Sequence, residues 1–152
     1  MLTDLLKKEN VKIKEGVQNW QEAVRVSLQD LVKGGYVEER YIDNVISSTH
    51  QYGPYYILAE DIALIHGRPE AGVLRRQMAV TLLRKPVRFP GDSYPVRLMI
   101  ALAATDSESH LDAMKVLATI LMDETKIQEM TEADTPETLY QLFLKAEEET
   151  EE

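Results

Sequence analysis

The most continuously apolar run in the chain is Val96–Ala104, with the sequence VRLMIALAA. A strand that is apolar on both of its sides belongs in the middle of a sheet that is covered on both faces. Helical periodicity occurs before and after this run, for example from Trp20 to Val32 and from Leu111 to Leu121. The sequence therefore predicts a single α/β domain, in which a mixed sheet of about five strands is sandwiched by helices.

Apolar periodicity and turn residues predict the individual elements. We expect strands over Val11–Lys14, Tyr55–Leu58, Ile62–Ile65, Met78–Leu83, Val87–Phe89 and Val96–Ala104. We expect helices over Leu2–Leu6, from Trp20 to Gly34-Gly35, over Val37–Thr49, from Ser107 to Leu121, over Thr125–Met130 and from Pro136 onward. Asn19 with Glu22 resembles a capping box, and Thr135 before Pro136 is a typical helix start.

A length of 152 residues favours one domain, which we expect to cover residues 1–146. Residues 147–152 are expected to form an acidic, solvated and frayed end of the last helix. This end holds five of the 26 acidic side chains, and hence more than half of the net charge of −9. The rest of the chain is only mildly acidic, which argues against nucleic acid as a partner.

Several classes of protein are excluded by what the sequence lacks. Without cysteine there are no disulfides, thiolate nucleophiles or cysteine-based zinc sites. Met1–Asn10 has no long apolar core like that of a signal peptide, and no apolar run approaches the ~20 residues of a membrane span. The phosphate-binding loops of nucleotide enzymes and the serine elbow of hydrolases are also missing. We therefore expect a cytoplasmic protein without a nucleotide cofactor.

Two histidines lie where sites collect in a doubly covered sheet. His66 ends an apolar strand and precedes the turn Gly67-Arg68-Pro69, while His110 lies in the first turn of the helix after Val96–Ala104. If the two strands are parallel neighbours, both imidazoles meet at one edge of the sheet, beside a helix N-terminus. This arrangement would suit a phosphoryl group carried on one histidine and hydrogen-bonded by the other, with Arg68 adding positive charge.

Simpler explanations for the same residues stay open on the sequence alone. A lone histidine beside an apolar strand is more often a structural or surface residue, and His110 could only assist the helix start. An arginine in a turn is usually solvated. The three histidines, His50, His66 and His110, also lack the H-E-x-x-H spacing of metal ligands, so no metal site is expected.

Two segments of the chain resemble the IIA component of the bacterial sugar phosphotransferase system (PTS), of the mannitol/fructose type. They are G-P-Y-Y-I-L at Gly53–Leu58 and H-G-R-P-E-A-G-V at His66–Val73, and both look most like the ascorbate-specific IIA proteins. Ala103–Asp106 and His110-Leu111 fit the same family. The resemblance extends from Trp20 to the last helix and implies the family fold, a mixed sheet between helices, for the domain of residues 1–146.

The resemblance also implies a function. His66 would be the phosphoryl acceptor, forming a tele-phosphohistidine with the phosphate of phosphorylated HPr and passing it to a cysteine of a IIB component. His110 would hydrogen-bond the phosphoryl group, and Arg68 and Gly67 would help to bind it. A membrane IIC component would move the sugar, L-ascorbate or a related pentitol or hexitol, and no cofactor or metal is needed. Two other functions stay open, a regulatory module that senses phosphorylation and a catalytically silent scaffold. A homodimer is also left open as the oligomeric state.

The chain departs from the family pattern in two places. Ile65 stands where the family often has proline, and Glu60-Asp61 stands where it often has Pro-Gly; we expect both on the approach to the site. The family's mannitol-type members have an arginine sixteen residues before the histidine, where this chain has His50, and that role is not transferred. An apolar collar for docking partners is expected from Leu64, Ile65 and Val73.

Overall fold

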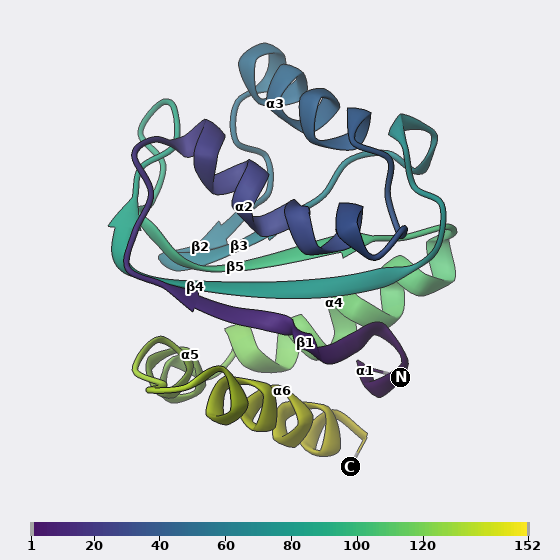
Figure 1. Ribbon diagram of the computed structural model, residues 1–152. Helices are drawn as coiled ribbons and strands as arrows, with labels where there is room; N and C mark the ends of the chain where they lie inside the picture. The colour runs from purple at the N-terminus through teal and green to yellow at the C-terminus, as the bar shows by residue number, and fades with distance from the viewer. Residues whose placement is uncertain (1, 152) are drawn as a thin grey trace.

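The computed structural model describes residues 2–151, which form a five-strand mixed sheet with helices on both faces (Figure 1). The strands are β1 (Leu6–Lys14), β2 (Ile57–Ala59), β3 (Asp61–Ile65), β4 (Gln77–Val87) and β5 (Val96–Ala103). The helices are α1 (Leu2–Leu5), α2 (Trp20–Lys33), α3 (Arg40–Tyr52), the 3₁₀ helix η1 (Pro69–Ala71), α4 (Ser107–Leu121), α5 (Glu124–Thr131) and α6 (Pro136–Glu151). The predicted α/β sandwich is confirmed.

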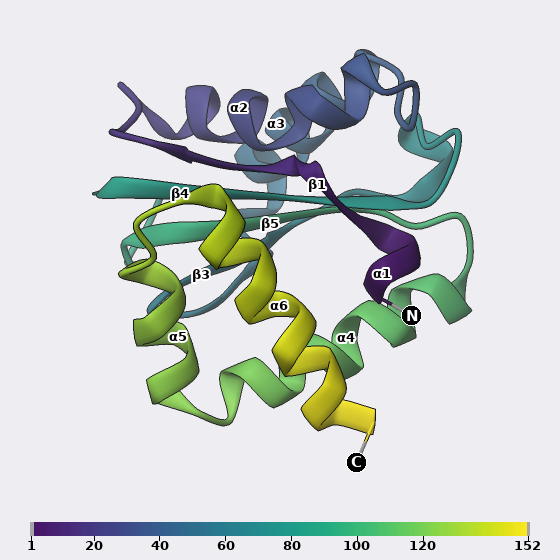
Figure 2. The ribbon, with the colours of Figure 1, turned by 60° about the horizontal axis from the view of Figure 1, so that its bottom comes forward.

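The sheet has the order β1-β4-β5-β3-β2, which places β5 at its centre. Strand β5 pairs antiparallel with β4 and parallel with β3, while β1 is parallel to β4 and β2 is antiparallel to β3. Helices α2 and α3 cover one face, and α4, α5 and α6 lie together over the other, as Figures 1 and 2 show. The central, doubly covered strand predicted from Val96–Ala104 is therefore confirmed.

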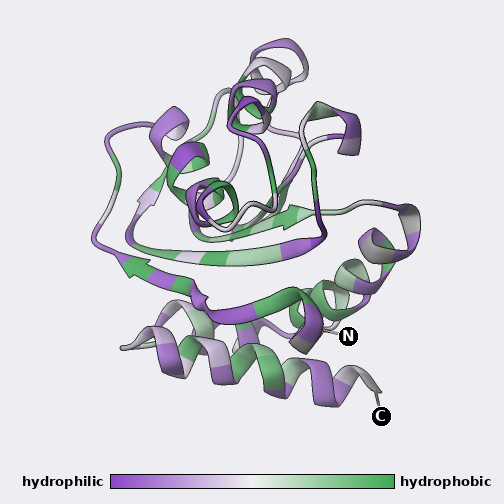
Figure 3. Cartoon of the chain, turned by 45° about the vertical axis from the view of Figure 1, so that its right-hand side comes forward, coloured by the Kyte–Doolittle hydropathy of each residue, from purple (hydrophilic) through white to green (hydrophobic). Residues whose placement is uncertain are grey.

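Alternate side chains of β5 enter two separate hydrophobic cores. Leu98, Ile100 and Leu102 pack on the side of α4, α5 and α6, whereas Met99 and Ala101 pack on the side of α2 and α3. Figure 3 shows the corresponding hydrophobic stretches along the sheet and on the helices. Burial on both faces explains why this strand is a continuous apolar run in the sequence.

The predicted cap of α2 is present with one change. The Glu22 N–H donates to Asn19 Oδ1 at 2.8 Å, as in a capping box. The Glu22 carboxylate in turn accepts a hydrogen bond of 2.7 Å from the N–H of Gln18, the residue before the cap, rather than from Asn19 itself. At the other end, Gly34 caps the helix and Gly35 adopts a left-handed φ of 76°, so the Gly34-Gly35 stop is confirmed.

Several predicted boundaries are wrong, among them the start of β2, which lies at Ile57 and not at Tyr55. Arg84-Lys85-Pro86 does not separate two strands, because β4 runs through it to Val87. The pairing with β5 jumps from Leu82↔Leu98 to Val87↔Val96, and this irregularity accommodates a proline that cannot donate a ladder hydrogen bond. β1 begins at Leu6, before the alternating segment, and α3 begins at Arg40 because Val37 instead forms an isolated bridge with Val73.

Helix α6 continues to Glu151 and so includes most of the acidic end of the chain. Glu147 is only 7% exposed, and Glu149 forms an ion pair with Lys126 of α5. Glu147 is thus packed and Glu149 is paired, whereas Glu148 between them is exposed. That the last turn frays stays a prediction.

Candidate active site

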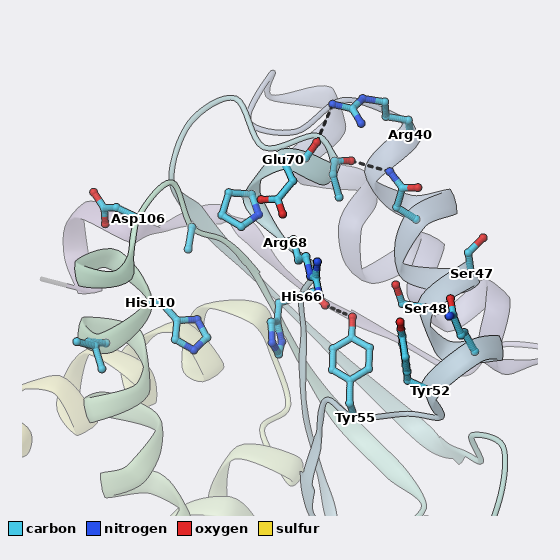
Figure 4. Close-up of a pocket in the computed structure, with 17 residues that line it drawn as sticks. Arg40, Ser47, Ser48, Tyr52, Tyr55, His66, Arg68, Glu70, Asp106 and His110 are labelled. Carbon is cyan, nitrogen blue, oxygen red and sulfur yellow. Dashed lines mark hydrogen bonds between the residues drawn. The ribbon is translucent and has the colours of Figure 1, made fainter.

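The parallel pairing of β3 with β5 brings the two predicted histidines to one edge of the sheet. Pairing ends at Ile65↔Ala101, and His66 follows directly on β3. Strand β5 leads through Ala104 into α4, whose first turn carries His110. The centroids of the two imidazole rings are 5.6 Å apart, with the ring planes tilted by 53°, and both rings line the same cavity (Figure 4). The sequence prediction that the two histidines meet is confirmed.

The His66 ring is held in one tautomer by its own strand. Its Nδ1 lies 2.7 Å from the carbonyl oxygen of Leu64, and a carbonyl can only accept, so Nδ1 carries the proton. Nε2 is then the nitrogen with the free lone pair. Burial lowers the pKa of His66 below 6.5, the bond to Leu64 opposes this, and nearby His110 lowers it further. At neutral pH the ring is therefore uncharged and nucleophilic at Nε2.

Tyr55, which the sequence reading did not single out, fixes the backbone of His66. Its hydroxyl donates to the His66 carbonyl at 2.5 Å, and the two rings meet edge to face with centroids 5.5 Å apart. This tyrosine lies within the G-P-Y-Y segment, so the family resemblance was the signal that could have indicated it.

The turn after His66 is held by Tyr41 of α3. The Gly67 N–H donates to the Tyr41 hydroxyl at 2.7 Å, so this amide already has a partner. Burial raises the pKa of Tyr41 to about 12, which keeps the phenol neutral at any physiological pH. Arg68, the next residue, is exposed, precedes η1 and lines the same cavity as the two histidines.

The cavity has a volume of about 1220 Å³ and is open to solvent. One wall is the start of α4 with His110, and the opposite wall is a polar face of α3 (Figure 4). That face contributes residues at helical spacing, which the sequence reading missed although the spacing was visible: Arg40, Asn44, Ser47, Ser48 and Gln51.

The predicted apolar collar is wrong in its residues. Leu64 and Ile65 are 1% and 0% exposed, because β3 is covered on both faces and sends them into opposite cores. Val73 does not line the cavity. The exposed apolar side chains that do so are Tyr52, Tyr55 and Leu111, at 69%, 43% and 57% exposure.

The two departures from the family pattern do not lie on the approach to the site. Asp61 begins β3, at the end opposite His66, and makes a bidentate ion pair with Arg97 of β5 at 3.0 and 2.9 Å. Ile65 is buried beneath the site rather than beside it. His50 is exposed on α3, contacts Trp20 edge to face and does not line the cavity.

Residues 4–146 match the family described as "Phosphoenolpyruvate-dependent sugar phosphotransferase system, EIIA 2". The chain belongs to this family. PTS IIA components are phosphotransferases that relay phosphate between PTS proteins. No helix among residues 2–151 combines the length and apolarity required to cross a membrane.

Two curated relatives cover nearly the whole chain. The mannitol-specific cryptic phosphotransferase enzyme IIA component of Escherichia coli K12 is 36% identical over 91% of this chain and 94% of that protein. The ascorbate-specific PTS system EIIA component of Shigella boydii is 30% identical over 91% and 92%. The likeness to ascorbate-type proteins is thus accompanied by a higher identity to a mannitol-specific one.

Solved structures agree with this assignment. The solution structure of the cryptic mannitol-specific IIA from E. coli superposes with a TM-score of 0.88 at 35% identity, covering 95% of this chain and 98% of that one. A second neighbour is the E. coli mannitol IIA in its complex with phosphorylated IIB, with a TM-score of 0.79 at 29% identity over 93% and 99% of the two chains.

Proposed function

We propose that this protein accepts phosphate from phosphorylated HPr on Nε2 of His66 and passes it to a cysteine of a cognate IIB component. The observation that carries the proposal is the hydrogen bond from His66 Nδ1 to the Leu64 carbonyl, with the His110 ring 5.6 Å away in the lining of the same open cavity. This bond leaves Nε2, the tele nitrogen, as the nucleophile.

The chemistry consists of two successive in-line transfers of the phosphoryl group, first to and then from Nε2 of His66. In the first, the lone pair of His66 Nε2 forms a bond to phosphorus as the nitrogen–phosphorus bond of the donor histidine breaks. In the second, the cysteine thiolate of IIB attacks phosphorus and Nε2 leaves. The Leu64 carbonyl keeps the Nδ1 proton in place throughout, and His110, Arg68 and the N-terminus of α4 balance the phosphoryl charge.

The partners follow from the same proposal. A relative solved in complex with phosphorylated IIB supports IIB as the acceptor. A membrane IIC component would then transport the sugar, L-ascorbate or a related pentitol or hexitol. The names of the two relatives support L-ascorbate and the hexitol mannitol. We place the protein in the cytoplasm, where phosphorylated HPr is available to it.

A labelling experiment tests the proposal. The full chain is incubated with the general PTS enzyme I, HPr and labelled phosphoenolpyruvate, and acid-labile phosphate on the chain is measured. We expect His66→Ala to take up no label. The matched control is His50→Ala, which removes an exposed histidine that does not line the cavity and should label like the parent. Equal labelling of His66→Ala and the parent would show that His66 is not the carrier.

A second step separates a carrier from a regulatory module. The labelled protein is mixed with a IIB component of a mannitol- or ascorbate-type system, and the phosphate is followed. A carrier loses its label to the IIB cysteine within turnover times, and His110→Ala slows both transfers while the fold stays intact. A chain that labels at His66 but retains the phosphate would instead be a phosphorylation sensor.

A further inference from the structure

The hydroxyl of Tyr41 lies between the ends of β3 and β5, the two strands that lead to His66 and His110. It accepts the Gly67 N–H at 2.7 Å and donates to the Leu102 carbonyl at 3.1 Å, with the Gly67 carbonyl at 3.3 Å as a second acceptor. Gly67 directly follows His66, and Leu102 belongs to the strand that leads to His110. One buried phenol thus contacts the backbone on both sides of the site.

The position of this hydroxyl is unusual in the sheet. Ile65↔Ala101 is the last pair of β3 and β5, and continuing the register would place Gly67 beside Ala103, next to the Leu102 carbonyl. The Tyr41 hydroxyl occupies the space where the next ladder hydrogen bond would lie. It therefore holds the strands apart by a fixed amount where His66 leaves the sheet.

The loop after His66 is folded around the same side chain. A Cβ on Gly67 would lie 3.4 Å from Tyr41 Cε1, and a Cβ on Gly72 would lie 3.2 Å from Tyr41 Cβ. Neighbouring residues of α3 secure the loop between these glycines, since Arg40 donates to the Glu70 carbonyl at 3.1 Å and Asn44 donates to the Ala71 carbonyl at 2.9 Å.

We propose that Tyr41 is a positioning residue of phosphoryl transfer, setting the separation of His66 and His110 and the placement of the Arg68 loop. The inference rests on the proposed function. Tyr41 is 0% exposed, so it has no surface with which to contact the phosphoryl group or a docking partner directly. Removing its hydroxyl should therefore change the transfer step and leave the affinity for the phosphorylated donor unchanged.

The test compares Tyr41→Phe with Tyr56→Phe in the full chain. Tyr56 is a matched control, because it is also 0% exposed and its hydroxyl is also hydrogen-bonded, to Thr49 Oγ1 at 2.8 Å, but away from the His66 turn. Each variant keeps its ring, so both should fold, with the larger loss of melting temperature in Tyr41→Phe because its hydroxyl has more hydrogen-bond partners than that of Tyr56. We expect Tyr41→Phe to lower the limiting rate of uptake from phosphorylated HPr about tenfold or more, with KM within about twofold. Tyr56→Phe should keep the parent rate.

Limiting rates of the two variants within about twofold of each other would overturn the role of Tyr41. So would a change confined to KM. These outcomes differ from a failure of the proposed function, in which His66→Ala would label like the parent whatever Tyr41 does. Should Tyr41→Phe not fold, Gly67→Ala perturbs the same contact from the loop side.

Discussion

Asp61 combines an unfavourable backbone conformation with a favourable ion pair, and substitutions can separate the two. Its φ of 71° is in the left-handed region, which costs an ordinary side chain roughly 1–2 kcal/mol and a glycine almost nothing. Its carboxylate binds Arg97 in bidentate geometry, with the two side chains 22% and 33% exposed. At that exposure, solvent screening limits the pair to about 1 kcal/mol.

These magnitudes predict an order of stabilities. Asp61→Gly loses the pair but relieves the backbone, so its free energy of unfolding should lie within about 0.5 kcal/mol of the parent. Asp61→Asn tolerates the left-handed conformation and loses only the pair, at a cost of about 1 kcal/mol. Asp61→Ala loses the pair and adds strain, at a cost of about 2 kcal/mol, or roughly 4–8 °C in melting temperature for a chain of this size.

Urea unfolding of the three variants measures the order, and a double-mutant cycle with Arg97→Leu measures the pair. We expect a coupling of about 1 kcal/mol that weakens in high salt. Phosphoryl uptake should be unchanged in all three, because Asp61 lies four residues before Ile65, roughly 13 Å along the strand. If Asp61→Gly were as unstable as Asp61→Ala, the backbone argument would be refuted.

Three shorter predictions follow. Because burial lowers the pKa of His66, the rate of phosphoryl uptake should fall to half of its maximum only below about pH 6.5, and the stability from keeping this ring neutral is likewise lost as the pH falls; a half-maximal rate above pH 6.5 contradicts this. Leu111→Glu should raise KM for phosphorylated HPr several-fold at an unchanged limiting rate, whereas Met122→Glu, at a side chain that is even more exposed but outside the cavity lining, should not. Asn19→Ala removes the bond to the Glu22 N–H and should cost about 1 kcal/mol in urea unfolding.

Those parts of the fold that depend on local pattern were predictable from the sequence. Burial on both faces makes a strand continuously apolar, so the central position of β5 was readable from Val96–Ala104. The same burial on both faces applies to β3. Its residues Leu64 and Ile65 are 1% and 0% exposed, so the predicted surface collar is wrong: proximity to His66 in sequence does not imply exposure.

The features of the fold and of the site that depend on contacts between residues far apart in sequence could not be predicted. Tyr41 lies at an apolar position of α3, and the sequence gives no sign that its hydroxyl reaches Leu102, 61 residues away. Pro86 predicts the end of a strand, but β4 continues through it because the β4–β5 register shifts there, which a single sequence does not show. Glu60-Asp61 is close to His66 in sequence, and this short separation predicts a place near the site. The five residues of β3 are extended, however, so Asp61 lies at the opposite end of the strand from His66.

The substitution Gly67→Ala distinguishes packing at the site from backbone strain. Gly67 has an ordinary φ, so alanine would stabilise the fold by reducing the conformational entropy of the unfolded chain. Against this, its Cβ would lie 3.3 Å from Val45 Cγ2 and 3.4 Å from the Tyr41 ring, which is a tight contact. The two effects nearly cancel, and we expect a stability change below about 1 kcal/mol. The turn must nevertheless shift, so the limiting rate of uptake should fall about tenfold. Gly91→Ala is the converse control: its φ of 78° makes alanine strained in open space, far from His66, so it should lose stability and keep its rate. Equal rates in the two variants would show that transfer tolerates movement of the His66 turn.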